Sequence, residues 1–300
     1  MIGLPNPDNA AAMEHAAIEG RSLWDDARAR LFRNKAAVLS MIVLGFFTAT
    51  AVLLPLVWPH DYQTIYTDRV SWSPTLEHLH ILGTDTLGRD QFARLMLGFR
   101  ISLLVGLLAT FVSLVIGVSW GAIAGYFGGR VDQAMMRIVD ALYAIPFIFF
   151  VILLTTVFER NIYLIFIAIG AVEWLTMSRI VRGQTLTTKT KEFIEAARAA
   201  GVSQPSIIIK HIVPNIVGPV VIYITLIIPQ VILLESFLSF IGLGINEPLT
   251  SLGVLLSEGK KQMSSKPWLL IYPALVMMIT LLCLNFVGDG VRDAVDPKER

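Results

Sequence analysis

Six stretches of the chain are almost continuously apolar. Each is long enough to cross a hydrocarbon core of about 30 Å, which takes about 20 helical residues. The pattern therefore predicts an all-α, polytopic membrane protein with six transmembrane helices. The expected spans cover residues 36–58, 101–127, 134–158, 162–181, 216–238 and 267–288.

Polar stretches separate these spans. We expect an amphipathic helix near residues 20–35, ahead of an uncleaved first span, because no signal-peptide cleavage site follows that span. Residues 239–266 are too few and too polar to cross the membrane again, so a short helix is expected there. The expected divisions are a leader at 1–35, a first span at 36–58, a loop at 59–97, a core at 98–288 and a tail at 289–300.

Composition and charge support this interpretation and set the orientation. Hydrophobic residues make up 55% of the chain and charged residues 16%, against about 45–50% and about 25% in soluble domains. If the leader is inside, 16 of the 24 Lys and Arg residues lie on the inner side, which predicts that both termini are cytoplasmic. The net charge of +1 gives no indication of nucleic-acid binding.

The polar stretch from Lys191 to Asn215 interrupts this apolar chain on the predicted inner side. Its small residues recur at helical spacing and form one stripe. Gly201 is placed to end this helix in a left-handed conformation, and a second short helix is expected before Pro214, where the chain returns to the membrane. The stripe consists of Phe193, Ala196, Ala197 and Ala200.

Within the spans, three glycines and two carboxylates stand out. Gly117, Gly121 and Gly125 recur every four residues and predict close packing of helix backbones. Glu173 and Glu235 are costly in a membrane. They would line a polar substrate path or take part in proton coupling, or else form structural contacts between helices. Prolines at positions 146 and 229 are expected to bend their spans.

Two other kinds of site find little support. His78 and His80 form an H-x-H pair with His60 and Asp61 nearby, but a lone H-x-H is a weak signal, and we predict no metal site. No Walker A sequence is present, since S-E-G-K-K around Lys260 lacks the required spacing and the following Ser or Thr. We therefore predict neither an enzyme active site nor a cofactor in this chain.

The stretch E-A-A-x-x-x-G, with a proline further on, resembles the EAA loop of ATP-binding cassette importer permeases. Glu195, Ala196, Ala197, Gly201 and Pro214 match that motif. The family's usual isoleucine and leucine before the proline are replaced by His211 and Val213. The stretches LGTDTLGRD, YFGGRVDQAMMRIVD and FVGDGVRDAVDPKER resemble the C-type permeases of the oligopeptide, dipeptide and nickel group. The leader looks closest to the oligopeptide permease C subunits.

This resemblance implies a type I importer permease fold over 98–288, with the EAA loop at 188–215. In that family the loop couples the permease to a cytoplasmic ATPase. Two homologous permeases form one pathway, two ATPases hold the ATP and magnesium, and an extracytoplasmic binding protein delivers the peptide. The coupling residues implied are Phe193, Glu195, Ala196, Ala197, Ala200, Gly201 and Pro214.

The expected function is therefore uptake of oligopeptides across a bacterial inner membrane. Dipeptide or nickel uptake by the same architecture is the alternative within the family. A proton-coupled carrier that uses Glu173 or Glu235, or a membrane scaffold without a substrate, are the alternatives from other classes. The EAA helix favours the importer over both.

Overall fold

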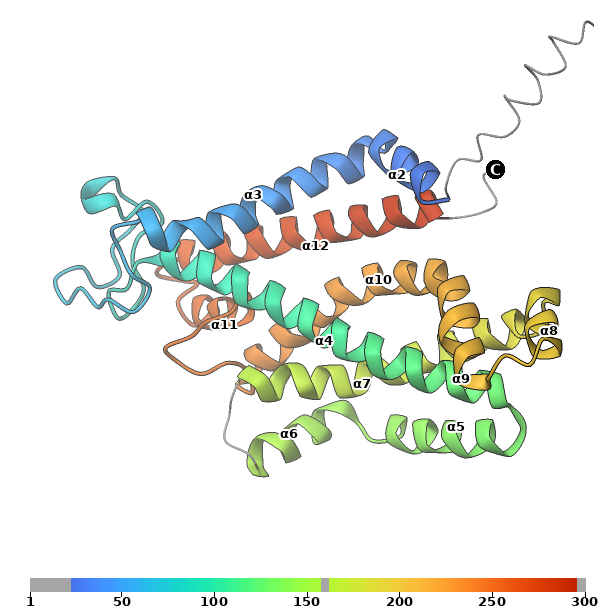
Figure 1. Cartoon of the computed structure of the whole chain (residues 1–300). Coiled ribbons are helices and arrows are strands. Elements are labelled where there is room, and N and C mark those ends of the chain that lie inside the picture. Colours follow the sequence, from blue (N-terminus) through green and yellow to red (C-terminus); the bar gives the residue numbers. More distant parts are fainter. Residues whose placement is uncertain (1–22, 158–161, 296–300) are drawn as a thin grey trace, which may run out of the picture.

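The computed structural model describes residues 23–157 and 162–295, which are helical over most of their length (Figure 1). Within these ranges the only β-structure is a single antiparallel bridge between Thr84 and Asp90. The helical elements are α2 (Leu23–Arg33), α3 (Lys35–Val57), η1 (Glu77–Leu79), α4 (Gln91–Phe127), α5 (Gly129–Tyr143), α6 (Phe147–Val157), α7 (Ile162–Thr188), α8 (Glu192–Ala199), α9 (Gln204–Ile207), η2 (Ile208–Ile212), α10 (Val213–Phe240), α11 (Leu252–Lys261) and α12 (Trp268–Val295).

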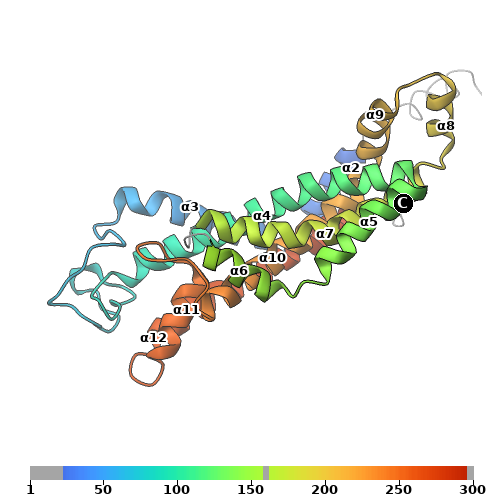
Figure 2. The same ribbon diagram turned by 90° about the horizontal axis from the view of Figure 1, so that it is seen from below.

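The long helices run roughly along one direction and leave distinct structures at the two ends. Helices α3 and α12 lie side by side, while α4 and α7 make the most extensive helix–helix contact and α10 packs against both. Both views place the loop of residues 58–90 and α11 at one end, which we call the loop end. Helices α8 and α9 lie at the other, the α8 end (Figure 2).

By length and composition, four helices in the described part of the chain can cross a membrane, and a fifth crossing is possible if the bent pair α5–α6 forms one span. Residues 162–181, expected as a span, lie in α7, which is not among these four. The all-α membrane architecture is thus confirmed, while the expected number of six is reached only in part. Helix α2 forms as expected, but residues 1–22 of the leader lie outside the described residues.

Side-chain caps begin three of these helices. Asn34, Asp90 and Ser251 each accept a hydrogen bond from a backbone N–H in the first turn of α3, α4 and α11. Such caps satisfy amide groups that have no partner inside the helix. The predicted short helix between the last two spans is α11.

Helix α4 corrects the expected loop boundary. It begins at Gln91, so the loop of 59–97 ends at residue 90, and the span expected at 101 extends three turns further. In the sequence, Asp85 or Asp90 could already cap a helix at Q-F-A-R. Arg94 in the first turn of α4 is only 1% exposed because it binds acidic groups of other segments. The 37 residues of α4 give a length of about 55 Å, well beyond a hydrocarbon core of about 30 Å.

Other boundaries also move, because helices continue past the apolar stretches that indicated them. The pair α5–α6 begins at residue 129 and bends by 79° around the predicted Pro146. Helix α10 continues through Pro229 without interruption, so a bend there does not divide the span. Helix α12 continues to Val295, so the expected tail at 289–300 is helical up to that residue, and 296–300 lie outside the described residues.

Candidate functional site

The coupling segment, residues 188–215, starts at the end of α7. Helix α8 has Lys191 as its N-cap and two acidic residues in its first turn, which favours the helix dipole. Gly201 has φ +75°, and its N–H donates to the carbonyl of Arg198 at 3.0 Å. The N–H of Val202 donates to Ala197 at 3.1 Å. This geometry bears out the role expected of Gly201 as the left-handed residue that ends the helix.

The two faces of α8 have different surroundings. Ile194 is 0% and Ala197 9% exposed, and both belong to the large apolar cluster of this chain. Phe193, Ala196 and Ala200 are exposed, as is Glu195. Ala197 therefore does not belong to the exposed docking stripe that the sequence predicted, because it packs against other residues of this chain. The exposed face retains the other three residues of that stripe.

Two cations attach the coupling segment to the last turn of α4. Lys189 Nζ donates to the carbonyl oxygens of Gly125 at 2.7 Å and Tyr126 at 3.4 Å. The guanidinium of Arg198 lies 5.1 Å from the centroid of the Tyr126 ring. Lys189 thus satisfies carbonyls that have no partner within α4, and α8 is fixed to the same turn by a cation–π contact.

The second helix of the segment is not separate from the following span. Ser203 precedes α9, and the helix continues through the π-helical turn η2 into α10. Pro214 lies inside this continuous helix, just after the π-helical turn η2. It therefore does not mark a break, and the span expected at 216 is continuous from residue 204.

The glycine stripe of α4 faces α7 as predicted. A Cβ atom at Gly117 would lie 2.5 Å from Met177, and one at Gly125 would lie 2.7 Å from Thr185. Such distances are too short for carbon atoms, so only glycine allows the two helices to come this close. Thr185 and Met177 are themselves fully buried.

Glu235 is enclosed by hydroxyl groups. Its Oε1 accepts a hydrogen bond from Ser239 at 2.7 Å, and its Oε2 accepts one from Ser102 at 3.1 Å. Ser102 in turn accepts from the N–H of Leu252 at 3.1 Å. The carboxylate is 0% exposed and joins α4, α10 and the start of α11. This position fits the structural alternative for Glu235.

Glu173 lies in a different environment. It is partly buried and lines a cavity of about 340 Å³ at the bend between α5 and α6. The structure therefore does not bring Glu173 and Glu235 together: one faces a cavity, and the other is sealed inside the helix packing.

Two of the predicted histidines come together with an unexpected carboxylate. Atoms of His60, His80 and Asp90 that could bind a metal lie within 4.8 Å of one another. His78 is half exposed and Asp61 is exposed, and neither belongs to this group. Asp90 follows the loop directly and caps α4, so its place beside the histidines depends on how the loop folds back.

Hydrogen bonds occupy this histidine group. The rings of His60 and His80 stack at 4.2 Å and 20°, so their in-plane lone pairs do not converge on one point. Each ring nitrogen already has a partner. These partners are the Tyr66 hydroxyl and the His78 carbonyl for His60, and the Asp90 carboxylate and the Arg69 guanidinium for His80. With a guanidinium beside it, the group favours a structural network over a bound cation.

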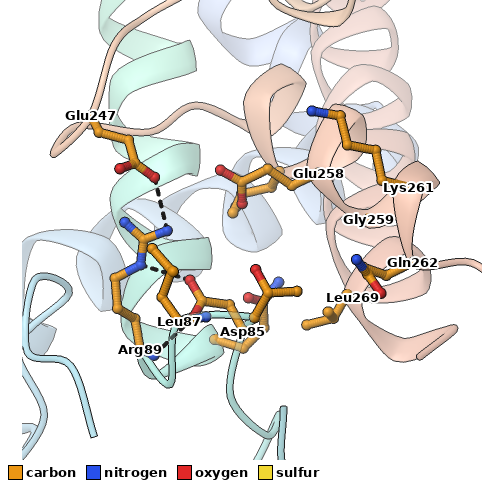
Figure 3. A pocket seen from close by; sticks show the side chains of 12 residues that line it. Asp85, Leu87, Arg89, Glu247, Glu258, Gly259, Lys261, Gln262 and Leu269 are labelled. Atoms are coloured by element: carbon orange, nitrogen blue, oxygen red, sulfur yellow. Dashed lines mark hydrogen bonds and ion pairs between the residues drawn. The ribbon is translucent and has the colours of Figure 1, made fainter. Parts of the chain in front are cut away.

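Sequence reasoning missed a group of charged residues at the loop end, the loop-end charge network of Asp85, Arg89, Arg94, Glu247 and Glu258. Asp85 Oδ2 accepts from Arg89 at 2.7 Å and from Arg94 at 2.6 Å. Arg89 also donates to Glu247 at 3.0 Å, and Arg94 donates to Glu258 at 2.8 and 3.1 Å. Figure 3 shows Arg89 between Asp85 and Glu247, beside a cavity of about 210 Å³.

The electrostatics of this network favour the charged form of Arg89. Burial alone would lower the pKa of Arg89, but hydrogen bonds and attraction from Asp85 and Glu247 raise the pKa above its ordinary value. The only signal in the sequence was the charge content of LGTDTLGRD, in which Gly83 and Gly88 suit turns and Asp85 or Asp90 could cap the following helix. The network joins this loop to α11 and to the segment before it.

Residues 117–300, from the middle of α4 onward, match the family described as "Binding-protein-dependent transport system inner membrane component". The chain belongs to this family. Residues 22–74 also match the N-terminal transmembrane domain of oligopeptide transport permease C. Members of the family are permease subunits without a catalytic domain, and ATPase activity belongs to separate subunits.

Curated relatives support this membership over nearly the whole chain. An oligopeptide transport system permease protein of Haemophilus influenzae is 53% identical over 97% of this chain and 94% of its own length. The corresponding Escherichia coli K12 protein is 53% identical over 96% and 95%. A dipeptide transport system permease protein of Bacillus subtilis is 40% identical over 93% and 87%.

A solved structure shows the same fold. The inward-facing methionine transporter MetNI aligns with a TM-score of 0.56 and 17% identity over 66% of this chain and 94% of that chain. At this identity the likeness concerns the fold alone, and it supports the predicted importer permease architecture.

Proposed function

We propose that this chain is a membrane-spanning permease subunit of an ATP-driven importer for oligopeptides. The relatives that match it over nearly its full length carry oligopeptide transport in their names. The observation that carries the mechanism is helix α8: Ile194 and Ala197 pack into the chain, while Phe193, Ala196 and Ala200 are presented outward. A helix fixed on one face and open on the other is suited to pass a partner's movement into the membrane helices.

The partners follow from this role. They are a second, homologous permease, two ABC ATPases that hold ATP and magnesium, an extracytoplasmic peptide-binding protein and membrane lipid. The chain itself needs no cofactor and binds no nucleic acid. We place it in a bacterial inner membrane with the α8 end and both termini in the cytoplasm, because most basic residues then lie inside.

The exposed stripe provides the main test. Ala196→Trp and Ala200→Trp each place a large ring on the face proposed to meet the ATPase. In the reconstituted complex they are expected to reduce co-purification of the ATPases or to make ATP hydrolysis insensitive to substrate. Ala197→Trp is unsuitable, because it disturbs this chain's own packing. Lys191→Ala, at an exposed position next to the helix, is the control.

Full assembly and full coupled transport in both stripe variants would show that α8 is only a connector. Substrate is tested in the same vesicles with a labelled oligopeptide, a dipeptide and nickel. Uptake of nickel alone would contradict the oligopeptide proposal. Uptake driven by a proton gradient without ATP would favour a carrier instead.

Orientation is tested with single cysteines in a Cys283→Ser background. Thr86 at the loop end and Thr190 beside α8 are both exposed, so each can be replaced by Cys and offered an impermeant thiol reagent. Labelling of position 86 from outside the cell, with position 190 protected, is the expected result. The reverse pattern would invert the topology.

A further inference from the structure

The three carboxylates of α5 and α10, two helices that pack against α7, all have partners. Asp132 accepts two hydrogen bonds from Arg182 at 2.5 and 2.6 Å, and Asp140 accepts one from Arg179 at 2.9 Å. Glu235 is surrounded by serine hydroxyls. Since an unsatisfied carboxylate is costly in a membrane protein, this pattern is the expected one.

Glu173 departs from this pattern. Among the described residues, 23–157 and 162–295, no hydrogen bond or ion pair of its side chain is found, although it is partly buried. Its position in the middle of α7 places it within a predicted span. A carboxylate held without a partner beside a cavity is suited to bind a cationic group that enters that cavity.

The cavity beside Glu173 has the size and lining for one end of a peptide. Its volume of about 340 Å³ is at the small end of ligand cavities, which measure about 300–1,000 Å³. The walls are mainly apolar, formed by Leu142, Ile145, Pro146, Phe147, Phe150, Ala171, Val172 and Leu175. Its polar groups besides Glu173 are those of Tyr143 and Thr176.

Aromatic groups near Glu173 add to this environment. The Tyr143 ring already accepts one cation, because the guanidinium of Arg179 lies 4.5 Å from its centroid. Phe147 and Phe150 supply further aromatic rings to the cavity wall. The site therefore combines one carboxylate, aromatic rings and apolar walls, which together suit an ammonium group attached to an apolar chain.

We propose that Glu173 binds the terminal ammonium group of a peptide in transit, in the cavity at the α5–α6 bend. This rests on the proposed function and names the group of the substrate that the permease recognises. Every peptide with a free amino terminus carries this ammonium group, whatever its side chains. One carboxylate can therefore serve many sequences, while the apolar walls contact the first side chain.

Binding is measured by protection of a cysteine in the cavity wall. Val172→Cys in a Cys283→Ser background is reacted with a thiol reagent in the purified permease–ATPase complex, with trialanine or N-acetyl-trialanine present. Trialanine is expected to slow the labelling by about tenfold, the effect of one charge-assisted hydrogen bond, and N-acetyl-trialanine to have little effect. Glu173→Gln should remove the protection, and Glu173→Asp should retain part of it.

Asp293→Asn, an exposed position on α12 outside the cavity, is the control and should leave protection unchanged. The proposal is overturned if both peptides protect equally, if neither protects, or if Glu173→Gln keeps the protection. In vesicles with the binding protein, Glu173→Gln should also lower trialanine uptake. Wild-type vesicles that take up no peptide would contradict the proposed function, whereas unchanged uptake in Glu173→Gln would contradict this inference alone.

A proton-coupling role for Glu173 gives a different result. Uptake would then continue without ATP under a proton gradient, and Glu173→Gln would abolish it for both peptides alike. That outcome would overturn the proposal that Glu173 recognises the ammonium group.

Discussion

Gly121 of α4 lies directly against the backbone of Ser178 in α7: a Cβ atom at Gly121 would be 2.4 Å from the Ser178 carbonyl oxygen. The same position would be 2.8 Å from Val181 Cβ. Helix backbones that approach this closely cannot slide past each other without first separating. The α4–α7 pair is therefore expected to move as one body when the coupling segment moves.

Replacing Gly121 tests this contact. Gly121→Ala forces the helices apart, because backbone atoms of Ser178 and Arg182 cannot move independently of α7. Overpacking of this kind costs about 1–3 kcal/mol. The expected result is a lower thermal stability of the purified complex. It is measured as the temperature above which a heated sample no longer elutes as a monodisperse peak in gel filtration.

Gly183 provides the matched control within α7. A Cβ atom there would meet nothing within 4 Å, so Gly183→Ala is expected to be neutral or to stabilise by up to about 1 kcal/mol through helix propensity. Equal thermal behaviour of the two alanine variants would mean that the close approach is not maintained.

Asp85 supports two buried guanidinium groups. Asp85→Asn removes the negative charge between Arg89 and Arg94, which are 7% and 1% exposed. Removing one partner of a buried ion pair costs about 3–5 kcal/mol. We expect this loss of stability to appear as local opening of the loop. Limited proteolysis within residues 59–90 is expected to become faster.

An exposed ion pair in the same loop is the comparison. Asp68 is 71% exposed and lies 3.3 Å from Arg69, and such pairs contribute at most about 1 kcal/mol. Asp68→Asn should therefore leave the proteolysis rate nearly unchanged. A similar rate for both variants would show that the loop-end charge network does not hold the loop.

His80 and His78 should respond differently to substitution, although they form one H-x-H sequence. His80→Ala leaves the buried carboxylate of Asp90 without the partner now at 2.8 Å, which costs about 1–3 kcal/mol. His78→Ala removes a half-exposed ring and should have little effect. Zinc or nickel should raise the thermal stability of neither variant nor of the wild type, and a clear stabilisation of the wild type would indicate a metal site.

Lys189 and Lys191 are neighbours with unequal roles. Lys189→Ala exposes the carbonyls of Gly125 and Tyr126 at the end of α4, with an expected loss of about 0.5–1 kcal/mol and weaker attachment of α8. Lys191→Ala should change neither the thermal stability of the complex nor the hydrogen exchange of α8. Hydrogen exchange in residues 188–201 measures the attachment, and equal exchange in the two variants would contradict the capping role.

Features that depend on local pattern could be predicted from the sequence. The glycines at every fourth position of α4, the bend at Pro146 and the left-handed Gly201 each follow from backbone geometry within a few residues. The apolar stretches likewise indicated most helices, because a membrane requires long apolar helices.

Features that depend on distant partners could not be predicted in this way. The buried face of α8 was not evident because alanines suit either side of a helix, and only the neighbouring cluster decides that Ala197 faces inward. The burial of Arg94 at the start of α4 depends on Glu258, which is 164 positions away. Asp90 looked like a helix cap, which it is, but its contact with His80 requires the whole loop to fold back.

The loop-end charge network also has a consequence for biosynthesis. Arg89 and Arg94 are made long before Glu247 and Glu258, since 158 and 164 positions separate the bonded pairs. While the ribosome is still completing the last third of the chain, Asp85 is the only member of the network that can pair with both arginines. The network can therefore be completed only after α11 has emerged and been delivered to the same end of the molecule. A chain truncated before residue 247 would leave two arginines to share the single carboxylate of Asp85.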